Sequence, residues 1–116
     1  WGKELVLSDQ KYLSAALNPS QKMNPAYGYL WWLNGQTATL PVLRRLRGPL
    51  NSEAPDDSVA ALGALGRKCY VVPSLDLVVT RLGDNPEINQ QPKFDIEFWR
   101  LLMKAAPDAT KNRNPA

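Results

Sequence analysis

Residues 27–33 form the run that most constrains the fold of this chain, because it is apolar on both of the faces that a strand would have. Aromatic and branched residues dominate the run, and Asn34 and Gly35 follow it as a turn that typically closes a strand. A strand with two apolar faces needs cover on both sides, which is demanding for a small chain. We therefore predict a doubly covered strand at 27–33, with at least one of Trp31 and Trp32 in the core.

The residues that are rare in this chain exclude several kinds of site. The chain has 116 residues, enough for one domain with a modest core, and it contains no histidine. A Ser-His-Asp or Cys-His catalytic arrangement and a His-based metal site are therefore excluded within the chain. The single cysteine, Cys69, allows neither an internal disulfide nor a zinc-binding cluster, and we interpret it as a small buried hydrophobe. We expect no metal and no cofactor.

The charge pattern offers one alternative function. The 14 lysine and arginine residues exceed the 11 acidic residues, and the only dense basic run is formed by Arg44, Arg45 and Arg47. A stand-alone α+β binding or scaffold module could use this run for an anionic partner. The aromatic residues lie elsewhere in the sequence, so the pattern typical of nucleic-acid-binding proteins is missing and no nucleic acid is expected. No apolar run approaches the ~20 residues that span a bilayer, so we expect no membrane span.

The first half of the chain predicts a helix, the strand described above and a long excursion. Apolar residues at helical spacing predict a helix that begins with Ser8 as its N-cap and ends before Pro19. Residues 36–57 contain three of the prolines and are interpreted as the excursion, with one helical turn at 42–46. Asp56 and Asp57 are interpreted as solvated residues of this excursion rather than a pair of catalytic acids.

The second half predicts a strand, a hairpin and a helix. Residues 58–65 form a candidate strand, and residues 68–72 and 77–82 form a hairpin around a turn at 73–76 that Asp76 favours. Residues 95–106 predict an amphipathic helix, and the tail at 107–116 is expected to be disordered. The apolar stripe of that helix is predicted to be Phe94, Phe98, Leu101, Leu102 and Ala105. The fold class is therefore α+β, with antiparallel strands flanked by an N-terminal and a C-terminal helix.

Several stretches of the chain share their sequence and order with one known family. They are 2–8 (GKELVLS), 27–35 (YGYLWWLNG), 59–66 (VAALGALG), 70–83 (YVVPSLDLVVTRLG) and 94–99 (FDIEFW). Together they resemble the C-terminal portion of serine β-lactamases and penicillin-binding proteins, above all the class C β-lactamase-related esterases and amide hydrolases. The resemblance implies that residues 1–106 are the C-terminal part of such a bacterial hydrolase domain, periplasmic or secreted, acting on a small ester or amide.

Enzymes of this family form an acyl-enzyme with three motifs, and the resemblance places two of them upstream of this chain. These two are Ser-x-x-Lys, which supplies nucleophile and base, and Tyr-x-Asn or Tyr-x-Ser, which transfers protons. Ser8 and Lys11 fit the first motif literally, but helix capping explains Ser8 and no Tyr-x-Asn follows. A Tyr-x-Ser at 12–14 lies on the same helical turn. We therefore regard the match as coincidental, and expect no catalytic residue in this chain and no activity from it alone.

The third motif is a Lys-Thr-Gly-like strand whose backbone N–H completes the oxyanion hole. The resemblance places it within 58–66, where no Lys-Thr-Gly occurs, and Arg67 stands where relatives often carry glutamine. This departure weakens the expectation of a β-lactam substrate more than it weakens the expectation of the family's fold. Alternatively, the two glycines of this stretch only allow close packing. The residues of the candidate pocket strand are Ala61, Leu62, Gly63 and Gly66.

Overall fold

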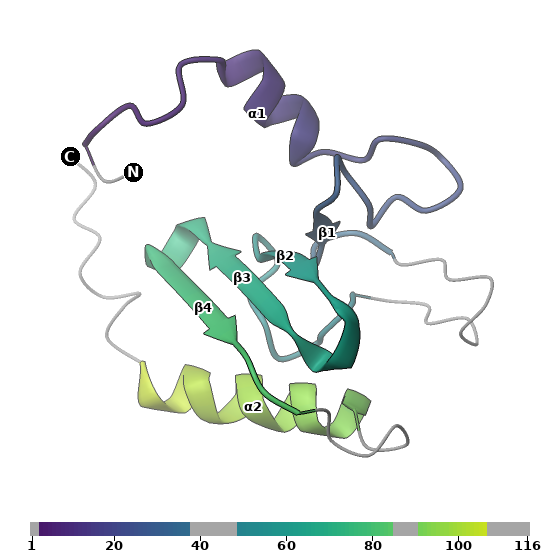
Figure 1. Ribbon diagram of the computed structural model, residues 1–116, viewed down its shortest axis with the longest axis vertical. Coiled ribbons are helices and arrows are strands. Elements are labelled where there is room, and N and C mark those ends of the chain that lie inside the picture. Colours follow the sequence, from purple (N-terminus) through teal and green to yellow (C-terminus); the bar gives the residue numbers. More distant parts are fainter. Residues whose placement is uncertain (1–2, 38–48, 85–90, 107–116) are drawn as a thin grey trace.

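Figure 1 shows the computed structural model of the chain, which describes residues 3–37, 49–84 and 91–106. A four-stranded antiparallel sheet of order β1-β2-β3-β4 follows one helix and precedes another, which confirms the predicted α+β class. No helix in these ranges is both long enough and apolar enough to cross a membrane. The elements are α1 (Gln10–Ala16), β1 (Trp32–Leu33), β2 (Val59–Leu62), β3 (Lys68–Val72), β4 (Leu77–Arg81) and α2 (Gln91–Ala105).

Some sequence predictions lie outside the described residues. They are the helical turn at 42–46, the basic run of Arg44, Arg45 and Arg47, and the tail at 107–116.

The hairpin of β3 and β4 is confirmed, with Tyr70 opposite Val79 at its centre. A short 3₁₀ helix, Pro73–Leu75, makes the turn, and Asp76 closes it in the left-handed region at φ 48°. Asp57 fixes this turn from outside, because its carboxylate accepts from the backbone N–H of Ser74 at 2.5 Å and from the Ser74 hydroxyl at 2.8 Å. Asp57 is exposed as predicted, but it also holds the hairpin in place.

The strand predicted at 27–33 is wrong for most of its length, since β1 contains only Trp32 and Leu33. The chain turns back before them: the N–H of Gly28 donates to the carbonyl of Trp31 at 2.8 Å, and Leu30 has a φ of 65°. The predicted cover on both faces is also missing, because the Leu30 side chain is 80% exposed. Trp32 does pack against the hydrophobic core, as expected for at least one of the two tryptophans.

A close contact with α1 explains this turn. Gly28 is buried, and a Cβ atom placed on it would lie 2.0 Å from the carbonyl oxygen of Ala16 at the end of α1. That same oxygen accepts the N–H of Tyr29 at 3.0 Å. The strand propensity of the aromatic residues is therefore overridden by a tertiary contact that only glycine permits.

Helix α1 is confirmed, but its cap differs from the predicted one. The N-cap is Asp9, whose carboxylate accepts the N–H of Tyr12 at 2.8 Å, and Ser8 lies one residue outside the helix. Aspartate and serine cap helices about equally well, so two adjacent candidates leave the first residue of the helix undecided from sequence.

Helix α2 begins at Gln91, four residues before the predicted start at 95, because a proline at 92 is tolerated in the first helical turn. Its buried face is centred on Trp99, which the predicted stripe omitted and which is fully buried. Phe98 and Leu102 of that stripe do pack against the core. Leu101, by contrast, is exposed, so the stripe is only partly confirmed.

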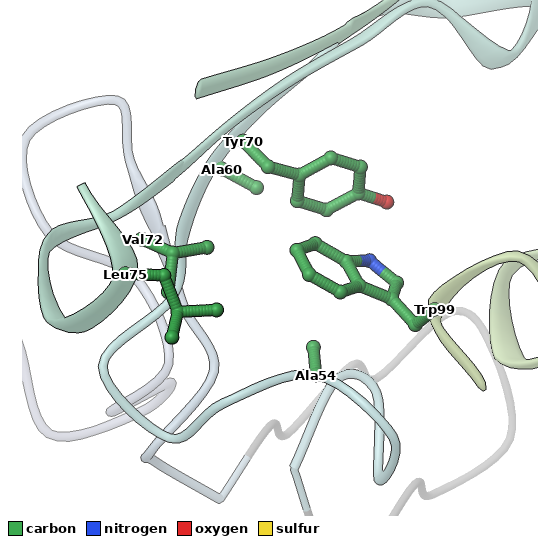
Figure 2. Close-up of a cluster of buried hydrophobic side chains, with 6 residues drawn as sticks. All are labelled: Ala54, Ala60, Tyr70, Val72, Leu75 and Trp99. Carbon is green, nitrogen blue, oxygen red and sulfur yellow. The ribbon is translucent and has the colours of Figure 1, made fainter. Parts of the chain in front are cut away.

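The core lies between α2 and one face of the sheet (Figure 2). The rings of Tyr70 and Trp99 meet edge to face, with centroids 5.1 Å apart. Burial, and secondarily the charge of Asp95, raises the pKa of Tyr70 to about 12, so its phenol stays neutral at ordinary pH. The buried members of this core are Ala54, Ala60, Tyr70, Val72, Leu75 and Trp99.

Asn34 anchors the connection that leads into β2. Its side chain is buried, and its amide nitrogen lies 3.0 Å from the carbonyl oxygen of Asn51 and 3.1 Å from that of Ala54. Its side-chain oxygen accepts the backbone N–H of Asn51 at 2.8 Å. The Asn34-Gly35 pair thus makes a turn, as predicted, and also supplies hydrogen bonds to a loop that has no strand partner.

Replacing Gly28 by alanine should destabilise the protein strongly, because the new methyl group would collide with the Ala16 carbonyl. We expect Gly28→Ala to lower the free energy of unfolding by about 2–3 kcal/mol in urea titrations. Gly63→Ala is the matched control, since a Cβ there would lie 3.6 Å from Arg67, which is ordinary contact. Equal losses for the two variants would show that the Gly28 contact is not specific.

Candidate functional site

The two faces of the sheet differ in how they are covered. Figure 1 shows α2 alongside the strands and α1 displaced from β3 and β4. Tyr70 and Val79 point toward α2, so their neighbours Cys69 and Thr80 point to the opposite face. That face is open around β4, where the side chain of Val78 is 48% exposed. We call it the open face.

A groove of about 450 Å³ lies at the end of β2 on the open face. It is bounded by the turn before β1, the end of β2, and parts of β3 and β4, and we call it the β2 groove. Its lining residues are Tyr27, Leu30, Ala61, Leu62, Gly63, Arg67, Lys68, Cys69, Thr80 and Leu82.

The β2 groove gathers most of the candidate pocket strand. Ala61, Leu62 and Gly63 line it. Gly66 does not: it is buried at φ 72°, and its carbonyl accepts a hydrogen bond from Arg81 at 2.7 Å. The positive φ of Gly66 favours glycine there whatever the packing around it. Gly63 has a negative φ of −106° and no close neighbour that would demand glycine.

The backbone N–H groups of this strand point in alternate directions. The N–H of Gly63 donates to the carbonyl of Arg67 at 2.8 Å, and by the alternation of an antiparallel ladder the N–H of Ala61 also points to β3. The N–H of Leu62 points to the other edge. Pairing with β1 goes no further than Trp32 opposite Ala60, so the N–H of Leu62 lies beyond β1, at the groove. Of these three N–H groups, only that of Leu62 is directed outward.

Cys69 and Thr80 place two polar atoms on the groove wall. They are directly opposite in the hairpin, and the hydroxyl of Thr80 lies 3.9 Å from the sulfur of Cys69. Cys69 is half-buried, so the prediction of a small buried hydrophobe is only partly met. This pair was not among the predicted site residues, although the register of the predicted hairpin sets residue 69 opposite residue 80.

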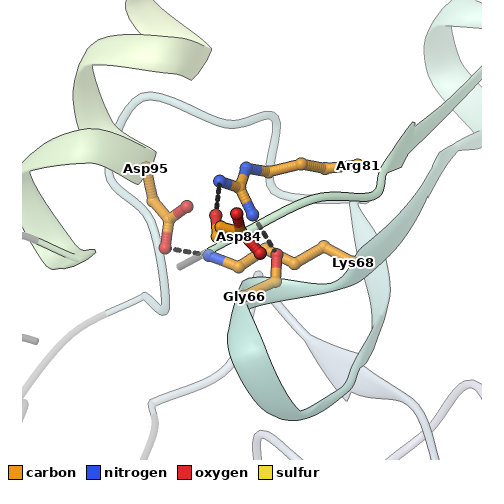
Figure 3. A network of polar contacts seen from close by, with 5 residues as sticks. All are labelled: Gly66, Lys68, Arg81, Asp84 and Asp95. Carbon is orange, nitrogen blue, oxygen red and sulfur yellow. Dashed lines mark hydrogen bonds and ion pairs between the residues drawn. The ribbon is translucent and has the colours of Figure 1, made fainter. Parts of the chain in front are cut away.

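A polar network joins the groove to the start of α2 (Figure 3). Lys68 forms an ion pair with Asp95 of α2. Beside it, the guanidinium of Arg81 donates to the carbonyl oxygens of Gly66 and Asp84, each at 2.7 Å. These contacts fix the ends of β3 and β4 against the helix, so the floor of the groove at Lys68 is held on rigid elements.

The structure does not bring Ser8 and Lys11 to this groove. Both residues are exposed at the beginning of α1, and neither lines the groove. Within the described ranges, no three acidic, cysteine or histidine side chains are close enough together to hold a metal ion.

No family model, no curated protein and no solved structure matches this chain.

Cys69 provides a direct test of the open face. We expect its thiol to react with 5,5′-dithiobis(2-nitrobenzoate) in the native protein within about tenfold of the rate in denaturant, since it lines an open groove. A control cysteine at Ala60, in a Cys69→Ser background, lies on the face beneath α2 and is expected to react only when the protein opens. Equal protection of the two thiols would contradict an open face.

Proposed function

We propose that this chain is the C-terminal part of a β-lactamase-related serine hydrolase domain, and that the β2 groove is one wall of its pocket for a small ester or amide. The observation that carries the proposal is the outward N–H of Leu62 at the groove. It lies on the strand where the sequence resemblance expects a pocket-lining strand to contribute one oxyanion donor.

In this reaction the serine hydroxyl attacks the carbonyl carbon of the substrate, and negative charge develops on the carbonyl oxygen. An N–H directed at that oxygen stabilises the charge, and the N–H of Leu62 would be one such donor. The serine bonds to the acyl group as the alcohol or amine leaves, and water then releases the acid and restores the hydroxyl. The serine, the lysine and the tyrosine are assigned to the upstream half of the domain.

The open face supports the same proposal. Val78 and Leu82 are exposed on it, and the exposed Leu62 lines the groove at its border; exposed apolar side chains that lie near one another favour contact with further protein. An upstream half of the same domain would cover these residues and would bring the nucleophile to the β2 groove.

The 116-residue chain alone should therefore be inactive. We expect it to show no labelling by a fluorophosphonate probe and no turnover of nitrocefin or p-nitrophenyl acetate above the buffer rate. Ser8→Ala serves as the control, because Ser8 is the only serine followed by a lysine at the spacing of the family motif. Labelling that disappears in Ser8→Ala would overturn the assignment of the nucleophile to another segment.

The full gene product gives the positive test. We expect its reading frame to encode Ser-x-x-Lys and then Tyr-x-Asn or Tyr-x-Ser upstream of Trp1, and its product to react with the fluorophosphonate. Leu62→Pro removes one N–H at a strand edge, where proline is tolerated, and should lower kcat by about 10²–10³. Leu62→Ala keeps the N–H and should retain most of the activity.

Two results would contradict the proposal. One is a full-length reading frame without these motifs. The other is full activity of the Leu62→Pro variant. Salt-sensitive binding of the inactive chain to polyanions, lost on replacing Arg44, Arg45 and Arg47 by alanine, would favour the binding-module alternative.

A further inference from the structure

Strand β4 is the outermost strand of the sheet in the described part of the chain, so one of its edges has no strand beside it (Figure 1). The alternation of the ladder identifies the backbone groups that lie on this edge. Gly63 bonds to Arg67, and every second pair of an antiparallel ladder is hydrogen-bonded, so Tyr70 turns its N–H and C=O toward β4. It pairs there with Val79, whose own N–H and C=O therefore point back toward β3.

The residues on either side of Val79 point the other way. The N–H and C=O groups of Val78 and Thr80 therefore lie on the outer edge of β4. Proteins usually block such an edge with a lysine, a proline or a bulge, and β4 has none of these. Its one charged side chain, Arg81, is hydrogen-bonded to carbonyl oxygens of its own chain (Figure 3). The edge is thus open to pairing with another strand.

An apolar flank of α2 lies beside this edge. Phe94, Phe98, Leu101 and Ala105 recur at helical spacing and form one line along the helix, which we call the α2 flank. The guanidinium carbon of Arg81 lies 4.8 Å from the centroid of the Phe94 ring, so the α2 flank is on the β4 side of the helix. Much of the flank is uncovered, since the side chain of Leu101 is 53% exposed.

The α2 flank contains no charged residue. Arg100 and Lys104 lie on the other side of the helix, where Arg100 forms an ion pair with Glu97. A partner that fits this surface must therefore bring two things at once. It must offer a strand to the β4 edge and an apolar surface to the α2 flank.

A second copy of this chain supplies both. Rotation by 180° about an axis through Val79, perpendicular to the sheet, sets Val78 opposite Thr80 of the second copy, and each such pair exchanges two hydrogen bonds. Arg81 then falls opposite Leu77, so no like charges meet along the edge. The same rotation keeps both α2 helices on one face of the continued sheet, where their flanks face each other.

We propose that the chain forms a symmetric dimer, in which the β4 strands of two copies pair antiparallel about Val79 and the two α2 flanks pack together. The proposal is independent of the hydrolase function, because none of the residues of the α2 flank lines the β2 groove. The edge contributes its backbone groups, and a loss of dimerisation leaves the Leu62 N–H in place.

Sedimentation equilibrium of the 116-residue chain tests the dimer. We expect the mean mass to rise from that of one copy toward that of two between about 1 and 500 µM, as for a weak dimer. Over this range, amide exchange at Val78 and Thr80 should slow at least about tenfold, while Leu62, at the other end of the sheet, should be unaffected. A single-copy mass throughout, or growth beyond two copies, would overturn the proposal.

Two lysine substitutions on α2 test the flank. Leu101→Lys sets two like charges across the axis and should weaken the dimer at least about tenfold. Ile96→Lys is the matched control, since Ile96 is 41% exposed on the side of α2 away from the flank, and it should leave the dimer unchanged. Both side chains are exposed within one copy, so neither variant should lose its fold. An unchanged dimer in Leu101→Lys would contradict the flank contact.

Two further variants separate the edge from the open face. Thr80→Pro removes one outward N–H at a strand edge, where proline is tolerated, and should weaken the dimer. Leu82→Lys charges the open face and should leave the dimer intact. A dimer that survives Thr80→Pro and is lost in Leu82→Lys would show stacking of open faces and overturn the β4 pairing. If Thr80→Pro fails to fold, the exchange rates at Val78 and Thr80 in the wild-type chain decide the same question.

Discussion

Trp99 lies fully buried between α2 and the sheet, with its indole edge-on to the ring of Tyr70. Removing a buried tryptophan of this kind costs about 3–5 kcal/mol, a large share of the stability of a small domain. Because this contact fixes α2 on one face, the helix cannot also cover the other. The opposite face of the sheet therefore stays open, with its groove, because Trp99 packs α2 against the face that carries Tyr70.

The turn at residues 28–31 also shapes the site. It keeps β1 short, because Leu30 adopts a left-handed conformation and leaves the ladder. A longer β1 would pair with Leu62 and occupy its N–H. Asn34 holds the other end of β1, where its N–H donates to the carbonyl of Ser58 at 3.0 Å and its side chain anchors the following loop. The position of β1, and with it the exposure of the Leu62 N–H, thus depends on these two contacts.

Sequence patterns predicted local structure well and tertiary choices poorly. Alternating apolar residues around a proline-containing turn were enough for the β3–β4 hairpin, and three residues of the candidate pocket strand do meet at the groove. The prediction of a strand at 27–33 was wrong because a contact between Gly28 and Ala16 overrides the strand propensity of these residues. Ala16 lies too far away in the sequence for a local pattern to reveal this contact. The predicted apolar stripe of the helix omitted Trp99. The face of α2 that is buried depends on contact with Tyr70, which is distant in the sequence. The pairing of Cys69 with Thr80 could be predicted only by working out the register of the two strands.

The proposed site depends on the N–H of Leu62, which points outward while the N–H groups of its neighbours are held in the sheet. Amide hydrogen exchange followed by NMR measures this directly, residue by residue. We predict that Leu62 exchanges at least about a hundredfold faster than Ala60, which pairs with β1, and than Ala61 and Gly63, which face β3. Protection of Leu62 equal to that of these three residues would contradict the claim.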